Sequence, residues 1–115
     1  MSELRIYGIK TCDACRKALR WLDEQGREYR WQDFRADGLE AERLRRWVES
    51  IGTDSLVNRR STTWRNLSED ERSRAADSDQ AVALLLEYPT LIKRPVIEQG
   101  GGVLVGFNAA IRDRL

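Results

Sequence analysis

The sequence predicts an α/β fold with a small mixed sheet and a helical insertion, and three observations support this prediction. Residues 1–37 contain a strand-like segment, an amphipathic helical segment and a second strand-like segment. The stretch 38–90 is mostly helical in pattern, and 91–115 contains two apolar runs around a glycine turn. With 115 residues, of which 41% are hydrophobic, the chain is long enough for one compact domain and too short for two.

The first segments have the pattern of a βαβ unit. Residues 4–7 alternate apolar and polar side chains and then meet Gly8, as a strand entering a turn does. The following helix ends near Gly26, and 28–34 alternates again. The apolar stripe of this helix has spacings of four and three and consists of Cys15, Leu19 and Leu22. Two strands joined by one helix should be parallel, with a right-handed crossover.

The middle of the chain alternates helical segments with short polar links. A stripe of apolar residues predicts an amphipathic helix over 39–51. We interpret 58–65 as a polar link. Ser68, with a glutamate three residues later, has the pattern of a capping box, so a helix should begin there. A further helix should begin at Asp77 or Ser78.

The last quarter predicts a β-hairpin followed by a short helix. Two apolar runs, 91–98 and 103–107, flank three glycines, and Asn108 can cap a helix over 109–115. The order β-α-β, helices, β-β-α is that of a thioredoxin-like fold carrying a helical insertion. We therefore expect a single thioredoxin-like domain over 1–115.

Composition excludes several classes of function. The formal net charge is +1 although 34% of the residues are charged, so the general basicity of a nucleic-acid-binding protein is absent. There is no histidine, which removes the usual general base, and two cysteines alone cannot complete a four-coordinate zinc site, so we expect no metal. The sequence has no apolar run long enough for a membrane span, and we expect a cytoplasmic protein. In that compartment, two cysteines are more often redox-active than joined in a structural disulfide.

The candidate reactive group is Cys12, at the junction between the first strand and the first helix. Unpaired N–H groups and the positive end of the helix dipole stabilise a thiolate at this position, with Lys10 and Thr11 beside it, whereas Asp13 opposes it. The alternative is a buried, inert cysteine. Cys15 follows one turn later and is either a resolving cysteine, which attacks a mixed disulfide on Cys12, or a core residue.

Four short motifs are distributed along the whole chain. They are Tyr7-Gly8-Ile9-Lys10 before Cys12, Arg60 ahead of Thr62-Thr63-Trp64-Arg65, Leu91-Ile92-Lys93-Arg94-Pro95, and Val105-Gly106-Phe107. This combination resembles the ArsC/Spx family, and the YffB-like branch of that family is the most similar.

The resemblance implies an oxyanion or thiol site. The nucleophilic cysteine of the arsenate reductases matches Cys12, and two of their three oxyanion-binding arginines match Arg60 and Arg94. The third would fall in 105–107, which contains no arginine, and losing one charged donor costs about 1.5–3 kcal/mol. This argues against arsenate itself as the substrate. Pro95 would be cis, and Arg59 competes with Arg60 for the role of anion contact.

Two main hypotheses follow from the resemblance. The first is a glutathione-dependent thiol reductase with no bound cofactor, whose partners are glutathione and a glutaredoxin or thioredoxin. The second is a redox-responsive regulator of the Spx type, which binds the α subunit of RNA polymerase under control of a Cys12–Cys15 switch. Its docking surface would be the exposed charged helix 39–51 and the turn that follows it. A family member that binds glutathione without turnover is the third alternative.

Overall fold

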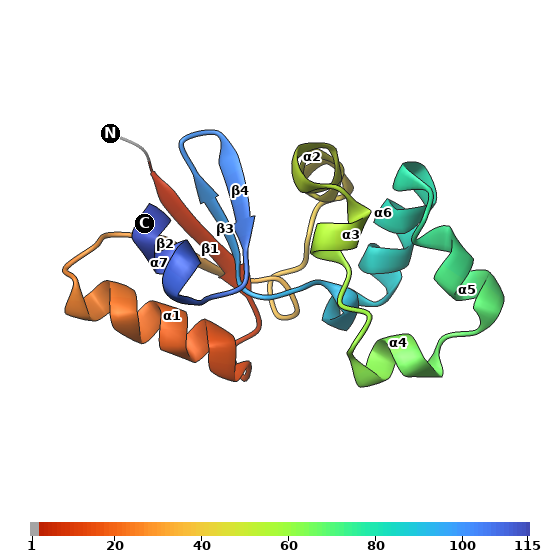
Figure 1. The fold of residues 1–115 in the computed structure, drawn as a ribbon, viewed down its shortest axis with the longest axis horizontal. Helices are drawn as coiled ribbons and strands as arrows, with labels where there is room; N and C mark the ends of the chain where they lie inside the picture. The colour runs from red at the N-terminus through yellow and green to blue at the C-terminus, as the bar shows by residue number, and fades with distance from the viewer. Residues whose placement is uncertain (1–2) are drawn as a thin grey trace. The chain divides into compact units, whose positions relative to one another are not determined.

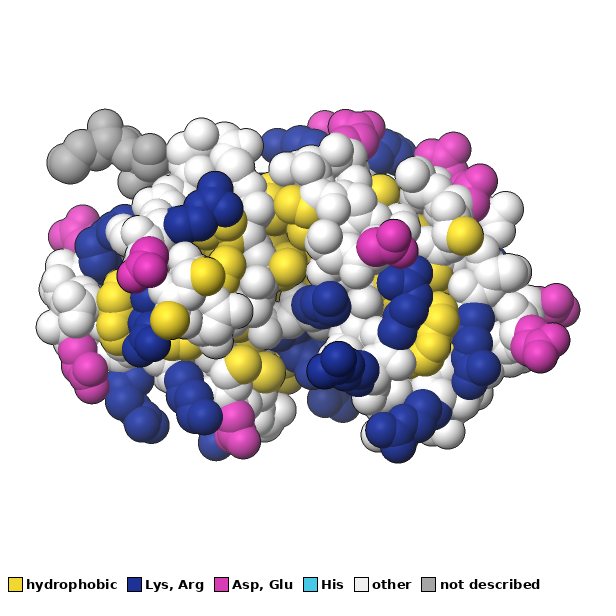
Figure 2. Space-filling model, in the orientation of Figure 1, with side chains coloured by type: hydrophobic (Ala, Val, Ile, Leu, Met, Phe, Trp, Pro, Cys, Tyr) yellow, Lys and Arg dark blue, Asp and Glu magenta, His cyan; other side chains and the backbone are white. Residues whose placement is uncertain are grey.

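A computed structural model describes residues 3–115 (Figure 1). The chain divides into two compact units, one formed by the segment up to Gly38 together with Arg94–Leu115, and the other by Leu39–Lys93. Acidic and basic side chains are interspersed over the visible surface of both units (Figure 2). No helix within residues 3–115 is long and apolar enough to cross a membrane.

The first unit contains a four-stranded mixed sheet. Its strands are β1 (Leu4–Gly8), β2 (Arg30–Asp33), β3 (Val96–Gln99) and β4 (Gly102–Val105). They lie in the order β2-β1-β3-β4, with β1 and β2 parallel and the other two pairs antiparallel. The predicted α/β class and the thioredoxin-like order of elements are therefore confirmed.

Two helices, α1 (Asp13–Glu24) and α7 (Ala109–Arg114), pack against one face of this sheet. Ile6 of β1 lies opposite Ile97 of β3, and Leu22 of α1 joins them in a core cluster that excludes solvent. Ile111 of α7 and Leu115, which follows this helix, are partly buried and pack against the same cluster. The stripe predicted for the first helix therefore faces the sheet and fixes the direction of α1.

The second unit is helical. Its elements are α2 (Ala41–Ile51), α3 (Thr53–Leu56), α4 (Thr62–Asn66), α5 (Glu69–Arg74), α6 (Ser78–Glu87) and the 3₁₀ helix η1 (Pro89–Leu91). Helices α2 and α6 pack against each other through buried residues such as Trp47 and Leu85. The predicted capping box is present, since the Ser68 hydroxyl accepts from the N–H of Glu71 at 3.1 Å and the Glu71 carboxylate accepts from that of Ser68 at 3.0 Å. Asp77 caps α6 as predicted.

The predicted hairpin is present as β3 and β4, whereas one predicted element was wrong and one was too long. The polar link 58–65 contains the start of α4, because the hydroxyl of Ser61 accepts from the N–H of Trp64 at 3.1 Å and caps a helix there. The predicted strand 91–98 is shortened to β3, because its first residues pair elsewhere. The N–H of Lys93 donates to the carbonyl of Leu56 at 2.8 Å, inside the helical unit.

Candidate active site

The first sulfur of the site lies at the N-terminus of α1. Cys12 is the N-cap residue, with extended backbone angles, and its carbonyl accepts the first helical hydrogen bond from the N–H of Arg16 at 3.0 Å. Its own N–H donates to the carbonyl of Ile9 at 2.9 Å, which closes a tight turn after β1. The Cys12 side chain is half-buried. The predicted strand–turn–helix junction is therefore present, and it presents the sulfur to the free helix end.

The surroundings of Cys12 favour its thiolate form. Partial burial by itself raises the pKa of the Cys12 thiol. That effect is outweighed by the backbone N–H of Cys15, by the guanidinium of Arg94 and by the thiol of Cys15, which together lower the pKa of Cys12 below its usual range. A lowered pKa at a solvent-accessible thiol is the property expected of a nucleophilic cysteine.

Cys15 has the opposite environment. Its side chain is 1% exposed, and burial, with a further contribution from the neighbouring Cys12 sulfur, raises the pKa of Cys15 to about 12. The sulfur lies against the backbone of Gly8, where an added Cβ would approach Sγ to 2.3 Å. Cys15 is thus a neutral thiol at physiological pH, packed into a space that only glycine leaves open.

Arg94 and Pro95 enter the site from the start of β3. The Arg94–Pro95 peptide bond is cis, as the resemblance implied, and the carbonyl of Pro95 accepts from the N–H of Gly106 at 2.9 Å. Arg94 is half-buried and interacts with Cys12. The side chains of Lys10 and Thr11 are exposed on the turn before α1, so their part in anion binding stays a prediction.

Asp33 is a residue of the site that the sequence reasoning missed. It ends β2 in register with Gly8, and its carboxylate accepts from the backbone N–H of Lys10 at 2.8 Å. It also accepts from the N–H groups of Arg35 at 2.9 Å and Ala36 at 3.0 Å. An aspartate that binds N–H groups two and three residues later is a recognisable turn signal, but its bond to the turn before Cys12 is not local.

The two candidate arginines of the helical unit differ in their contacts. Arg59 pairs with Asp54 at 3.2 Å and lies over the ring of Trp64, 5.3 Å from its centroid. The N–H of Arg60 donates to Oδ1 of Asn58 at 3.0 Å, and its exposed guanidinium makes no ion pair with any residue of 3–115. Within this unit, Arg60 is therefore the more available of the two for an anion, and its role at Cys12 stays a prediction.

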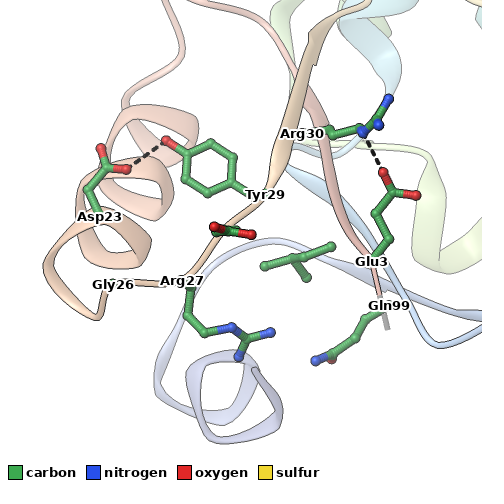
Figure 3. A pocket seen from close by; sticks show the side chains of 9 residues that line it. Glu3, Asp23, Gly26, Arg27, Tyr29, Arg30 and Gln99 are labelled. Atoms are coloured by element: carbon green, nitrogen blue, oxygen red, sulfur yellow. Dashed lines mark hydrogen bonds and ion pairs between the residues drawn. The ribbon is translucent and has the colours of Figure 1, made fainter. Parts of the chain in front are cut away.

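A separate hollow of about 1160 Å³ lies at the other end of the sheet, where β1 and β2 begin (Figure 3). Several of its polar side chains contact one another. The hydroxyl of Tyr29 donates to Asp23 at 3.0 Å, and Arg30 pairs with Glu3. It contains no cysteine. No group of three cysteine or carboxylate side chains within the described chain could hold a metal ion.

Comparison with known proteins places this geometry in a family. A model of the ArsC family matches residues 7–113, which include both cysteines and the candidate arginines Arg59, Arg60 and Arg94. The chain belongs to the ArsC family.

Relatives of this ArsC-family chain match about nine-tenths of its length, and their names point to different roles. An uncharacterized protein of Haemophilus influenzae is 48% identical, with 91% of each chain covered. The global transcriptional regulator Spx of Listeria monocytogenes is 30% identical, with 90% of this chain and 79% of the regulator covered.

Solved structures agree with the family assignment. A YffB protein is 42% identical with a TM-score of 0.87, covering 96% of both chains. An arsenate reductase (ArsC) related protein of Brucella melitensis is 41% identical with a TM-score of 0.78, covering 97% of this chain and 92% of that one. The predicted membership of the ArsC/Spx family and the likeness to YffB are thus confirmed.

Proposed function

We propose that this ArsC-family protein is a thiol-dependent reductase that uses the Cys12 thiolate as nucleophile and glutathione as co-substrate. The observation that carries the proposal is the half-buried Cys12 sulfur at the N-terminus of α1, beside the guanidinium of Arg94 and with a lowered pKa. A thiolate at neutral pH is the reactive form in thiol–disulfide exchange.

The chemistry balances with a disulfide as the oxidant. The Cys12 thiolate attacks one sulfur of the substrate disulfide, the sulfur–sulfur bond breaks, and the other sulfur leaves as a thiolate. A glutathione thiolate then attacks the substrate sulfur of the mixed disulfide, Cys12 leaves as a thiolate, and the substrate half departs as a mixed disulfide with glutathione. Arg94, beside the sulfur, is placed to hold a carboxylate or oxyanion of the substrate through its planar fork. With only two of the three arginines that the arsenate reductases use, the site should handle arsenate poorly.

Glutathione is a better resolving group than Cys15 in this arrangement. A resolving thiol must be ionised to attack, and burial keeps the pKa of Cys15 at about 12. Cys15 instead acts on Cys12 as a neutral donor, since its thiol lowers the pKa of the Cys12 sulfur. We therefore favour a monothiol route.

Mass spectrometry after incubation with oxidised glutathione tests the proposal. The wild type and the Cys15→Ala variant should both carry one glutathione on Cys12, and Cys12→Ser should carry none. Alkylation of Cys12 at about pH 6 should be fast in the wild type and absent in Cys12→Ser. A wild-type protein that loses two protons and gains no adduct would refute the monothiol route. A Cys12 that is inert to both reagents would refute the reductase.

A second candidate function is a redox-responsive regulator, which the adjacent Cys12 and Cys15 sulfurs and the 30% identity to Spx favour. In this case oxidation of the pair would change the affinity for RNA polymerase. A pull-down with the polymerase α subunit, under reducing and oxidising conditions, separates the two functions. Binding that changes with oxidation supports the regulator, and no binding in either state removes it.

A further inference from the structure

The exposed side of α1 next to Cys12 is positively charged. Helix geometry places Cys12, Arg16 and Arg20 along one line, because residues four apart lie on the same face. Lys17 lies beside this line, and Lys10 lies in the turn before the helix. We call the four exposed cations Lys10, Arg16, Lys17 and Arg20 the α1 basic stripe.

Two acids lie near the sulfur end of the stripe, Asp13 and Asp33, and the Asp33 carboxylate accepts from the backbone N–H of Lys10 at 2.8 Å. Asp13 approaches Arg16 at 3.9 Å, and its side chain is 89% exposed, so this pair is weak. The next acids of α1, Asp23 and Glu24, lie at the far end of the helix. Basic side chains gather along the lower left edge of the view, where α1 lies (Figure 2). This local excess contrasts with a chain whose net charge is only +1.

The cations of the stripe are not equivalent. Nε of Arg16 donates to the carbonyl of Lys10 at 3.2 Å, so this arginine also supports the turn before Cys12. Lys17 and Arg20 make no ion pair with any residue of 3–115, and both are exposed. Two exposed cations without an ion pair among residues 3–115, with Arg20 in line with the Cys12 sulfur and Lys17 beside it, are available to a binding partner.

We propose that the α1 basic stripe is a docking surface for an acidic peptide segment that flanks the disulfide or mixed-disulfide cysteine of a protein substrate. This proposal rests on the proposed function, because the docked segment must deliver its sulfur to Cys12. Charge complementarity identifies the occupant. An acidic segment running along α1 would meet Arg16, Lys17 and Arg20 while its cysteine sulfur reaches the helix N-terminus. The stripe then discriminates between protein substrates, which the use of glutathione as co-substrate does not do by itself.

Electrostatic docking of this kind acts mainly on the association rate and is sensitive to salt. At about 0.01 M salt the Debye length is about 30 Å, and at about 0.1 M it falls to about 10 Å. We expect an acidic substrate to react faster than a basic one at low salt, and the preference to shrink as the salt concentration rises.

The experiment uses three short peptides that differ only in the residues flanking one cysteine, which are aspartate, glutamine or lysine. Each cysteine carries a thiopyridyl group as a mixed disulfide, and attack by Cys12 releases a chromophore. Loss of two exposed cations in Lys17→Gln/Arg20→Gln should slow the reaction with the aspartate peptide about three- to tenfold at low salt and leave the glutamine peptide within about twofold. The matched control, Arg45→Gln/Arg46→Gln, removes two exposed helix cations outside the stripe and should change neither rate.

A charge-reversed variant makes the test reciprocal. Lys17→Glu/Arg20→Glu should reverse the preference, so that the lysine peptide reacts faster than the aspartate peptide. Equal rates for all three peptides with the wild type would overturn the docking surface while leaving the reductase intact. Failure of Cys12 to react even with the neutral peptide would overturn the reductase itself. An oligonucleotide that blocks the reaction where a cysteine-free aspartate peptide does not would assign the stripe to nucleic acid and also overturn the proposal.

Discussion

The contact between Gly8 and Cys15 gives a sharp test of how the site is built. A Cβ added at Gly8 would lie 2.3 Å from the Cys15 sulfur and 3.2 Å from the ring of Trp31. Carbon and sulfur atoms in contact are normally separated by about 3.5–4.0 Å, so the Cys15 sulfur would have to move by about 1 Å or more. Because Cys15 is 1% exposed and Trp31 closes the same space, that movement displaces packed atoms.

The change Gly8→Ala should therefore destabilise the protein. Replacing a strand glycine by alanine on its own stabilises by about 0.4–1 kcal/mol through the unfolded state. Overpacking costs about 1–3 kcal/mol, so the net loss should be about 0.5–2 kcal/mol. The Tm should fall by about 2–8 °C for a chain of this size. Thermal and urea unfolding under reducing conditions measure this loss.

Two further variants isolate the cause. Gly102→Ala is the matched control, since Gly102 is also a strand glycine and a Cβ there meets only the carbonyl of Gln99 at 3.4 Å. Its stability should equal or exceed that of the wild type. Removing the sulfur in Gly8→Ala/Cys15→Ala should recover part of the loss, with a coupling energy of about 0.5–2 kcal/mol. A Gly8→Ala protein as stable as the wild type, or no coupling to Cys15, would refute the reasoning.

Three other predictions concern the turn, the buried thiol and the helical unit. Asp33→Ala, which leaves the N–H of Lys10 without its carboxylate, should slow Cys12 alkylation severalfold and shift its pH profile, and Asp33→Asn should restore part of the rate through its carbonyl. In Cys12→Ser, Cys15 should resist iodoacetamide until urea is added. Burial is the largest cause that raises the pKa of Cys15, and it does not depend on Cys12. The stability gained by a neutral Cys15 thiol is therefore complete below the unfolded pKa of about 8.5 and is lost as the pH rises toward the raised folded pKa, as unfolding of Cys12→Ser with and without Cys15→Ala would show. Ser68→Ala should cost about 1 kcal/mol of unfolding free energy by circular dichroism, and no loss would show that the capping box contributes nothing.

The parts of the fold that depend on local sequence were predictable. A serine followed by a glutamate at the third helical position defines a capping box on its own, and Asn108 caps α7 in the same local way, accepting from the N–H of Ile111 at 2.9 Å. Cys12 could be placed because an N-cap is defined by the strand before it and the helix after it. The helix α4 was missed, because its cap at Ser61 lacks the partner glutamate that makes such a signal recognisable.

The exact pairing partners of distant segments, and the register of that pairing, were not predictable. The apolar residues before Arg94 have the pattern of a strand, but their partners are the residues around Leu56 in the helical unit. Asp33 reaches the turn before Cys12 only because the parallel register places it beside Gly8. The sequence alone does not indicate that register. Cys12 could therefore be predicted as the centre of the site, whereas the contact of Asp33 with the turn before it could not.

The two cysteines show why residue spacing alone could not assign their roles. They belong to one turn of one helix, yet one is half-buried beside Arg94 and the other is enclosed by β1, so their pKa values move in opposite directions. Cys15 need not form a disulfide to matter for the chemistry, because its thiol and its backbone N–H both stabilise charge on Cys12. Cys15 therefore occupies the core position that was one of the two alternatives predicted from the sequence, and it supports Cys12 in a way that is neither of them. A sulfur packed against Gly8 is held where it supports the thiolate of its neighbour.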